Sequence, residues 1–411
     1  MIHDWNACGP APAPRGAALL DETLRDGLQS PSARAPSLED KRALVRAADG
    51  LGIDAIDLGL PGAGPRVASD VRALCELVRD EGLHIRPACA GRTLEADIAP
   101  IIDIAEATGV PIEILTFLGA SPIRAWAEGW SRDTMRRLVR DAVRLGVAAG
   151  LPVSFVTEDT VRAHPDVLAD LYRVALEEGA GRIVVCDTVG HATPDGVRAI
   201  VTWTRALLER EGAADVGIDF HGHNDRGLAL TCSLAALEAG ADRVHGTALG
   251  IGERVGNCAM DQLLVNLALM GASDRDLSGL AAWCRHVARA TGVTIPASHP
   301  VVGDDAFRTA TGVHAAAIVK ALDKGGTGAA DLVYSGVPAE LVGRAQDIVV
   351  GPLSGDANIV AWLARRQLPT NPGLVAELRR HAKASDHVVP DDELLAVVAH
   401  CLTDVHRPLA A

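Results

Sequence analysis

The sequence has little positive charge and few aromatic side chains. Acidic residues outnumber basic ones by 53 to 39, so the formal net charge is −14. Nucleic acids and anionic membranes select basic surfaces, so the charge disfavours both as partners. Aromatic residues make up 3% of the chain, whereas hydrophobic residues make up 48%. A core of small aliphatic side chains suits helices packed on a buried parallel sheet.

Paired cysteines and an apolar leader are also missing. The eight cysteines are scattered without a Cys-x-x-Cys pair, which argues against a disulfide framework and predicts reduced, mostly buried thiols. Residues 1–15 are rich in proline and alanine without an apolar run, so we expect neither a secretion signal nor a membrane span there. We therefore expect a cytoplasmic protein with a flexible N-terminal segment at residues 1–16.

A strand–helix pattern repeats from residue 17 to about residue 270. Helix start signals support it, including Ser37 before residues 38–51 and Thr193 before residues 194–211. Such alternation predicts parallel βαβ units, and eight units over about 250 residues predict a TIM barrel. A doubly wound open sheet is the alternative. The eight apolar runs are residues 17–20, 53–58, 84–87, 111–117, 152–156, 182–186, 216–220 and 243–249.

The pattern changes after residue 270, where a helical stretch at residues 277–290 leads to a linker at residues 294–296. Further stretches with helical spacing follow the linker. The expected fold is therefore α/β: a (β/α)₈ TIM barrel at residues 17–293, then a smaller, mostly helical C-terminal subdomain at residues 294–411. Glycines at residues 324–328 predict a flexible turn within this subdomain. Its expected helices lie at residues 358–364, 374–382 and 391–402.

A TIM barrel carries its catalytic side chains at the carboxyl ends of the strands. Each of the eight predicted strands is followed by a polar side chain that can take part in chemistry, so the sequence meets this requirement. These residues are Asp26, Asp57, Arg92, Ser121, Glu158, Asp187, Thr188, His221, His223, Glu253 and Asn257.

The most informative motif is His-Gly-His-Asn-Asp at residues 221–225, at the end of an apolar run. Side chains alternate along a strand, so His221 and His223 project from the same side. Alone, the pair could equally be two histidines on a polar strand edge. Asp26 after the first strand and Asn257 after the last favour a metal site, because the strand ends meet at one end of a barrel.

One carboxylate, two imidazoles and one amide make a mixed nitrogen and oxygen ligand set. Such a set suits Zn²⁺, Mn²⁺ or Co²⁺ and tolerates Mg²⁺. Three or four protein ligands leave open positions on the ion, which is typical of a catalytic site. The ion would act as a Lewis acid toward a chelating substrate, and a 2-oxo acid is a natural chelator.

Arg25, next to Asp26, and Thr188, after the sixth predicted strand, are candidates to contact such a substrate. If Arg25 points into the barrel mouth, it sets a positive charge beside the carbonyl that becomes an alkoxide. Loss of one such group typically costs about 3–4 kcal/mol of barrier. A structural ion pair under the rim is the alternative for Arg25. Thr188 could donate its hydroxyl to the substrate carboxylate or cap its own turn.

Three motifs resemble the 2-isopropylmalate synthase/homocitrate synthase family, also called DRE-TIM metallolyases. The resemblance implies a Claisen-type condensation, in which an acyl-CoA, usually acetyl-CoA, adds to a 2-oxo acid before thioester hydrolysis. The protein would then be an acyltransferase. The motifs are Thr-Leu-Arg-Asp-Gly-x-Gln-Ser-Pro at residues 23–31, His-Gly-His-Asn-Asp at 221–225 and Gly-Glu-Arg-x-Gly-Asn at 252–257.

The resemblance also implies roles for single residues. Asp26, His221 and His223 would bind the metal, with Asn257 as an associated or direct ligand, and Arg25 and Thr188 would orient the oxo acid.

The C-terminal subdomain would complete the active site, often that of a partner subunit, which implies a homodimer. His314, assisted by Glu158, would remove a proton from the acyl methyl group or activate the hydrolytic water, and Tyr334 would join it.

The sequence departs from the family pattern at three places. One is Gly-Leu-Pro at residues 59–61, where the family usually has Gly-Phe-Pro, and the other two change the charge of a side chain. The family usually has Glu at the position of Leu28, and often Ser-x-x-His at the position of Ser121 to Arg124. Together these changes alter the charge of the pocket mouth, and we hypothesise that an unusual or extra-acidic oxo-acid side chain binds near Arg124. The residues expected to bind substrate are Arg25, Gln29, Arg92, Ser121, Arg124 and Thr188.

Two alternatives remain open. Residues 25–29 also resemble 3-hydroxy-3-methylglutaryl-CoA lyase, so the enzyme could cleave a carbon–carbon bond as a lyase or aldolase. Residues 252–257 and the long C-terminal subdomain argue against the lyase, and Cys258 is expected to be a core thiol rather than the lyase cysteine. The other alternative is a non-catalytic binding barrel, which the intact metal set disfavours.

Overall fold

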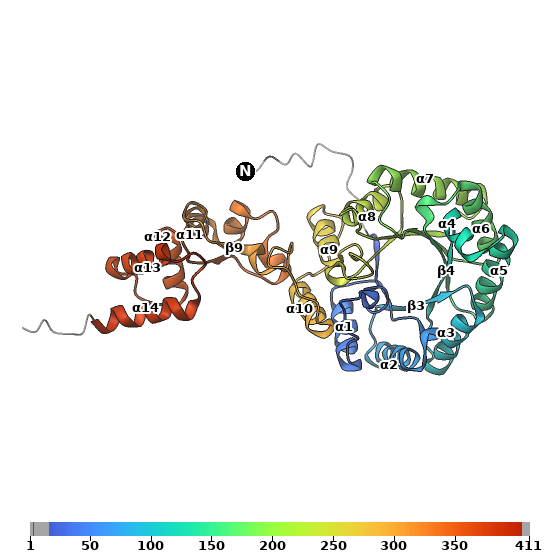
Figure 1. Cartoon of the computed structure of the whole chain (residues 1–411), viewed down its shortest axis with the longest axis horizontal. Helices are drawn as coiled ribbons and strands as arrows, with labels where there is room; N and C mark the ends of the chain where they lie inside the picture. The colour runs from blue at the N-terminus through green and yellow to red at the C-terminus, as the bar shows by residue number, and fades with distance from the viewer. Residues whose placement is uncertain (1–2, 4–15, 405–411) are drawn as a thin grey trace, which may run out of the picture. The chain divides into compact units, whose positions relative to one another are not determined.

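The computed structural model describes residue 3 and residues 16–404, in two compact units that meet between Thr294 and Ile295. In the first unit, eight parallel strands close into a barrel in chain order, with helices around the outside (Figure 1). The expected TIM barrel is confirmed and the open sheet is excluded. The strands are β1 (Ala18–Asp21), β2 (Ala55–Asp57), β3 (Arg86–Arg92), β4 (Glu113–Gly119), β5 (Val153–Glu158), β6 (Arg182–Asp187), β7 (Gly217–Gly222) and β8 (Arg243–Gly246).

The helices of the barrel begin where the sequence carries capping residues. The Ser37 hydroxyl accepts a hydrogen bond from the Asp40 amide, and the Thr193 hydroxyl accepts one from the Gly196 amide, as expected for N-caps. The helices are α1 (Leu38–Gly50), α2 (Pro65–Glu81), α3 (Glu95–Thr108), α4 (Pro122–Glu128), α5 (Arg132–Ala148), α6 (Pro165–Glu177), α7 (Pro194–Arg210), α8 (Ala229–Glu238), α9 (Met260–Leu269) and α10 (Leu280–Thr291).

Six strands end within two residues of their predicted ends, and two, β3 and β8, end further away. β3 continues to Arg92 instead of ending near residue 87, because its alanines, glycine and cysteine hid it from a search for bulky apolar runs. β8 ends at Gly246 instead of near residue 249, because Leu249 and Gly250 adopt left-handed backbone conformations that end the strand direction.

The interior of the barrel has an apolar half and a charged half. Leu20, Ala55, Ala88 and Leu115 form a small apolar layer across β1 to β4. On the other side, Arg243 of β8 is almost completely buried, and its guanidinium donates to the carboxylate of Asp219 on β7 at 2.6 Å.

Arg243 also crosses the barrel. Its Nη1 donates to Oε2 of Glu113 at 2.8 Å, and Glu113 lies on β4, four strands away in the closed ring. Ser154 of β5 donates to the same carboxylate at 2.5 Å. Burial opposes ionisation of Glu113, yet its bonds to Arg243 hold its pKa below the usual value. The arginine therefore makes buried carboxylates compatible with the barrel interior.

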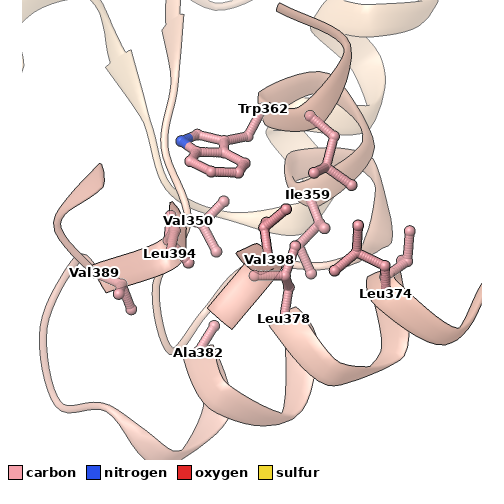
Figure 2. Packing of buried hydrophobic residues seen from close by; sticks show 11 residues of the cluster. Val350, Ile359, Trp362, Leu374, Leu378, Ala382, Val389, Leu394 and Val398 are labelled. Atoms are coloured by element: carbon pink, nitrogen blue, oxygen red, sulfur yellow. The ribbon is translucent and has the colours of Figure 1, made fainter. Parts of the chain in front are cut away.

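The second unit is mostly helical, as expected, and includes a two-stranded parallel sheet of β9 (Arg308–Thr309) and β10 (Asp347–Ile348). Its core packs Ile359 and Trp362 against residues of the last two helices, among them Leu378 and Val398 (Figure 2). The Trp362 indole donates to Asp391 at 2.8 Å. The helices are α11 (Gly312–Tyr334), α12 (Asp356–Arg365), α13 (Pro372–Ala384) and α14 (Asp391–Asp404).

Helix α11 was not predicted, because its glycine-rich centre indicated a turn. The helix breaks at Gly326, whose φ of +72° is left-handed. The rings of His314 and Tyr334 lie only 4.1 Å apart, although twenty residues of straight helix would span about 30 Å. The glycine stretch therefore joins two helical halves that fold back on each other.

The expectation of unpaired, mostly buried cysteines is confirmed for the described residues. Cys75, Cys89, Cys186, Cys232, Cys258 and Cys284 are free and buried. Among the described residues, no helix has the length and apolar character needed to cross a membrane. The segment expected to be flexible, residues 1–16 with Cys8, lies outside the described residues apart from His3 and Gly16.

Replacing Arg243 with Met should destabilise the barrel by about 3–5 kcal/mol, because the partly buried Glu113 would lose its cation and the buried Asp219 would keep only Arg182 of its two guanidinium partners. Urea denaturation followed by circular dichroism measures this loss. The control is Arg144→Met, which removes an exposed arginine paired with Glu178 and should leave the midpoint near that of the wild type. Equal losses in both variants would contradict the account.

Candidate metal centre and active site

Three donor atoms converge at the carboxyl end of the barrel. Nε2 of His221 lies 3.3 Å from Nε2 of His223, and Oδ2 of Asp26 lies 3.6 Å from the first and 3.4 Å from the second. Two ligand atoms that bind one ion tetrahedrally at about 2.1 Å lie roughly 3.4 Å apart. The triangle therefore already has the dimensions of a set that could hold a metal ion.

The loops after the last three strands bring Asn257 to the same place. His221 lies within β7, and His223, one residue beyond it, forms an isolated bridge with Asn257. The His223 amide donates to the Asp187 carbonyl at 3.1 Å, and the Asn257 side chain donates to the Ile251 carbonyl at 3.2 Å. The alternation of strand side chains thus places both imidazoles as predicted.

The donor set fits a divalent ion. Oδ2 of Asp26 and Oδ1 of Asn257 are buried and accept no hydrogen bond from any described residue, which is costly for polar atoms inside a protein. An ion would satisfy them. With one carboxylate, two imidazoles and an amide oxygen, the set suits the ions expected from the sequence.

The protonation states also suit metal binding. Burial lowers the pKa of His221 to about 3 and that of His223 to about 4. Burial acts in the opposite direction on Asp26, but Arg25 and the two imidazoles hold its pKa at about 2. At neutral pH the site therefore presents two neutral imidazoles and a carboxylate, the states in which these groups bind metals.

Arg25 is held by three carboxylates. Its Nε donates to Oδ2 of Asp57 at 3.0 Å, its Nη1 lies 3.3 Å from Oδ1 of Asp26, and its Nη2 pairs with Oε2 of Glu22. Burial raises the pKa of Asp57 to about 6, and Arg25 opposes that rise. Arg25 thus takes part in a structural ion cluster and also lines the central cavity.

Glu22 and His245 belong to the site but were missed in the sequence. Oε1 of Glu22 lies 3.0 Å from Nδ1 of His221 and 2.7 Å from Nδ1 of His245. His245 lies within β8, and Glu22 is the first residue after β1; both line the cavity at the barrel mouth. A charged or imidazole side chain within an apolar strand, or directly after one, was the signal that could have identified them.

The cavity at the barrel mouth contains only some of the residues expected to bind substrate. Arg25, Gln29 and Thr188 line it, and so does Glu158, which was expected to be catalytic. The remaining lining residues are Glu22, Asp26, Ala90, Leu115, Phe117, Val156, Val184, Cys186, His221, His223, His245 and Glu253.

Arg92, Ser121 and Arg124 instead make local contacts outside this lining. Arg92 binds both oxygens of Asp97 at 2.7 and 2.9 Å. Ser121 caps α4, where it accepts from the Arg124 amide at 3.4 Å. The Arg124 guanidinium lies 3.2 Å from Glu158 and 3.3 Å from Glu128. A substrate role for these three residues stays a prediction.

Thr188 and Glu158 line the cavity, Thr188 as a possible hydrogen-bond donor and Glu158 as a carboxyl group with a raised pKa. The Thr188 hydroxyl accepts from the Asp159 amide at 2.7 Å, which leaves its hydrogen free to donate. This bond reaches a neighbouring loop rather than the threonine's own turn. Burial raises the pKa of Glu158, and the Arg124 guanidinium partly offsets that rise.

His314 and Tyr334 lie in the second unit, on the two halves of α11. Nδ1 of His314 lies 3.0 Å from the Thr311 hydroxyl, and its ring packs on that of Tyr334. Cys258, by contrast, is a core thiol as expected: it is buried, and burial raises its pKa to about 12.

The fold and the carboxylate–imidazole cluster define a TIM-barrel protein with a candidate metal centre at the carboxyl end of its strands. The chain belongs to the HMGL-like family, whose model matches residues 17–285. The resemblance to 2-isopropylmalate and homocitrate synthases found in the motifs is confirmed over most of this chain by the following relatives.

A homocitrate synthase of Methanopyrus kandleri is 31% identical over 374 residues, which cover 90% of this chain and 88% of that protein. A 2-isopropylmalate synthase of Xylella fastidiosa is 34% identical over 304 residues, covering 72% of this chain and 57% of that protein. Among solved structures, the HMG-CoA lyase of Bacillus subtilis shares the fold, with a TM-score of 0.56 at 22% identity over 69% of this chain and 97% of that chain.

Co²⁺ or Mn²⁺ should raise the melting temperature of the metal-free protein, since a ligand at one hundred times its Kd stabilises the folded state by about 2.7 kcal/mol. Thermal denaturation with and without the ion measures the effect. His223→Ala should lose it, whereas the control His84→Ala, at an exposed residue before β3, should keep it. An undiminished effect in His223→Ala would place the ion elsewhere.

Proposed function

We propose that the protein condenses an acyl-CoA, usually acetyl-CoA, with a 2-oxo acid and then hydrolyses the thioester to release CoA. The observation that carries this proposal is the convergence of Asp26, His221 and His223 beside Arg25 in a cavity at the barrel mouth. Membership of a family with relatives named 2-isopropylmalate, homocitrate and citramalate synthases supports it.

Asp26, His221 and His223 would hold a divalent ion, Mg²⁺, Mn²⁺, Zn²⁺ or Co²⁺, with Asn257 as a fourth or associated ligand. A bound ion supplies Lewis acidity, which polarises a chelated carbonyl and favours the developing alkoxide. Because both imidazoles are neutral at physiological pH, the ligands need to lose no proton before binding.

Arg25 would stabilise the negative charge that forms on the oxo-acid carbonyl oxygen. Its three carboxylate partners fix the guanidinium in place, so it needs little reorganisation during the reaction. Thr188 would donate its remaining hydroxyl hydrogen to the substrate carboxylate, and Gln29 is near enough to the cavity to assist.

Glu158 would accept the proton from the acyl methyl group, because it is the lining carboxylate outside the ion cluster whose pKa burial raises. The proton would leave the methyl carbon as the new carbon–carbon bond forms at the carbonyl carbon of the oxo acid. Water would then attack the thioester carbonyl, and CoA would leave as its thiol. His314 is proposed to assist the methyl deprotonation or this hydrolysis.

The side chain of the oxo acid is proposed to be short and apolar. The wall opposite the metal ligands consists of apolar side chains from β3 to β6, including Leu115, Phe117 and Val156. Among the described residues that line the cavity, Arg25 is the one guanidinium, and Arg124 outside it already faces two carboxylates. An acidic side chain would therefore lack a free cation, contrary to the hypothesis drawn from Arg124.

Thiol release measured with acetyl-CoA, Mn²⁺ and a panel of 2-oxo acids tests this function. Free CoA should appear only with an accepted acid, and 2-oxoisovalerate should be turned over faster than 2-oxoglutarate or oxaloacetate. Each methylene placed in an apolar pocket is worth about 1–3 kcal/mol of discrimination. Asp26→Ala and His221→Ala should be inactive, because each removes a proposed ligand.

Preference for the diacids would favour the Arg124 hypothesis over the apolar pocket. No CoA release with any acid, together with cleavage of 3-hydroxy-3-methylglutaryl-CoA, would replace the synthase by the lyase alternative.

We also propose a homodimer in which His314 and Tyr334 of one copy serve the barrel of the other. Exposed apolar side chains support a partner: Val313 and Leu332 are exposed on α11, and Trp126 is exposed on α4 after β4. Val313, Leu332 and Tyr334 are all exposed on α11, and apolar surface concentrated on one element is typical of contact surfaces between proteins.

Mixing inactive variants tests the shared site. Asp26→Ala and His314→Ala should each be inactive, yet an equal mixture after subunit exchange should recover roughly a quarter of wild-type activity, since half of the dimers carry one intact site. CoA release measures the recovery. A mixture no more active than either variant alone would contradict the sharing of sites.

A further inference from the structure

Glu22 contacts both the metal ligand His221 and Arg25, but it is neither a proposed metal ligand nor a proposed substrate-binding residue. It is buried, and it follows β1 at an inward position. Its two carboxylate oxygens face different partners. Oε1 lies 3.0 Å from Nδ1 of His221 and 2.7 Å from Nδ1 of His245, and Oε2 pairs with Arg25.

The contact with His221 defines which ring nitrogen carries the hydrogen. A carboxylate can only accept, so Nδ1 of His221 donates to Glu22, and Nε2 keeps its lone pair. That lone pair faces Asp26 and His223, at 3.6 and 3.3 Å. A carboxylate on the far nitrogen of a ligating histidine also makes the ligand more basic and fixes its ring.

The carboxylate of Glu22 is itself held by His245. His245 on β8 contacts Glu22 through Nδ1 and Oδ2 of Asp219 through Nε2, at 2.7 and 3.0 Å. Asp219 is held in turn by Arg243, which anchors the chain of contacts across the barrel. The Glu22 carboxylate therefore has little freedom to rotate away from His221.

We propose that Glu22 is a positioning residue that fixes the tautomer and orientation of His221 and holds Arg25 beside the same ion. The inference rests on the proposed metal centre and deepens it. Glu22, His221 and His245 also form a second group that could hold an ion. Their hydrogen-bond distances to one another argue for a network without a second ion.

The test is Co²⁺ binding to the purified, metal-free full-length protein. Calorimetry measures the Kd, and the visible spectrum reports the coordination of the bound ion. Glu22→Gln removes the charge and turns an amide N–H₂ toward Arg25, so Co²⁺ should bind about 10- to 100-fold more weakly. The matched control is Glu113→Gln, which makes the same change on the same network but at its far end. Its Kd should stay within about twofold of wild type, because Glu113 is not an outer partner of a ligand.

Folding is checked by circular dichroism, and Glu22→Asp serves as a second variant if Glu22→Gln does not fold. Asp keeps the charge but is one methylene shorter, so it should also weaken binding. Weaker binding in either folded variant, with an altered Co²⁺ spectrum, supports the positioning role. Wild-type affinity in both folded variants overturns it.

Two further outcomes separate this inference from the proposed function. If the wild-type protein binds no Co²⁺, the metal centre itself fails, and the role of Glu22 fails with it. If the wild type binds two ions per chain and Glu22→Gln binds one, Glu22 is a ligand of a second ion rather than a positioning residue.

Discussion

The pairing of buried carboxylates inside the barrel is the constraint on which the rest of this structure depends. Glu22 and Asp219 are buried and Glu113 is partly buried in the closed barrel, where an unpaired charge would be strongly destabilising. Arg243 neutralises two of them from opposite sides of the barrel, and Arg25 with two histidines satisfies the third. The resulting network of hydrogen bonds and ion pairs links Arg243 and Glu113 to His221 through Asp219, His245 and Glu22. It therefore restricts the position of the His221 ring.

The division of the interior follows from the same constraint. The metal ligands and their imidazole and carboxylate neighbours come from the loop after β1 and from β7 and β8. Apart from Glu158 of β5, strands β3 to β6 contribute Leu115, Val156 and other apolar side chains to the cavity wall. A substrate bound across this boundary would place its chelating head on the polar side and its hydrocarbon part against the apolar side. In the proposed reaction, the metal ion and the side chain of the oxo acid would therefore contact different strands.

Much of this arrangement could be predicted from the sequence because barrel strands impose simple rules. The period of two placed His221 and His223 together, and the rule that strand ends meet brought in Asp26 and Asn257. The same rule could not tell that Arg92 turns to Asp97, because proximity to a strand end does not reveal a partner within one turn of helix.

His245 was missed because it lies within β8, where an apolar side chain is the usual expectation, and Glu22 was missed because Arg25 and Asp26 were taken as the polar residues that follow β1. Helix α11 was not predicted because its glycines indicated a turn and its exposed apolar residues gave no clear apolar face.

The most direct test of the central claim is formation of the new carbon–carbon bond. The protein with Mn²⁺, a 2-oxo acid and acetyl-CoA labelled with ¹³C in the methyl group should yield a labelled 2-hydroxy diacid by carbon NMR. Labelled acetate or unchanged acetyl-CoA alone, from protein with its metal site filled, would contradict it.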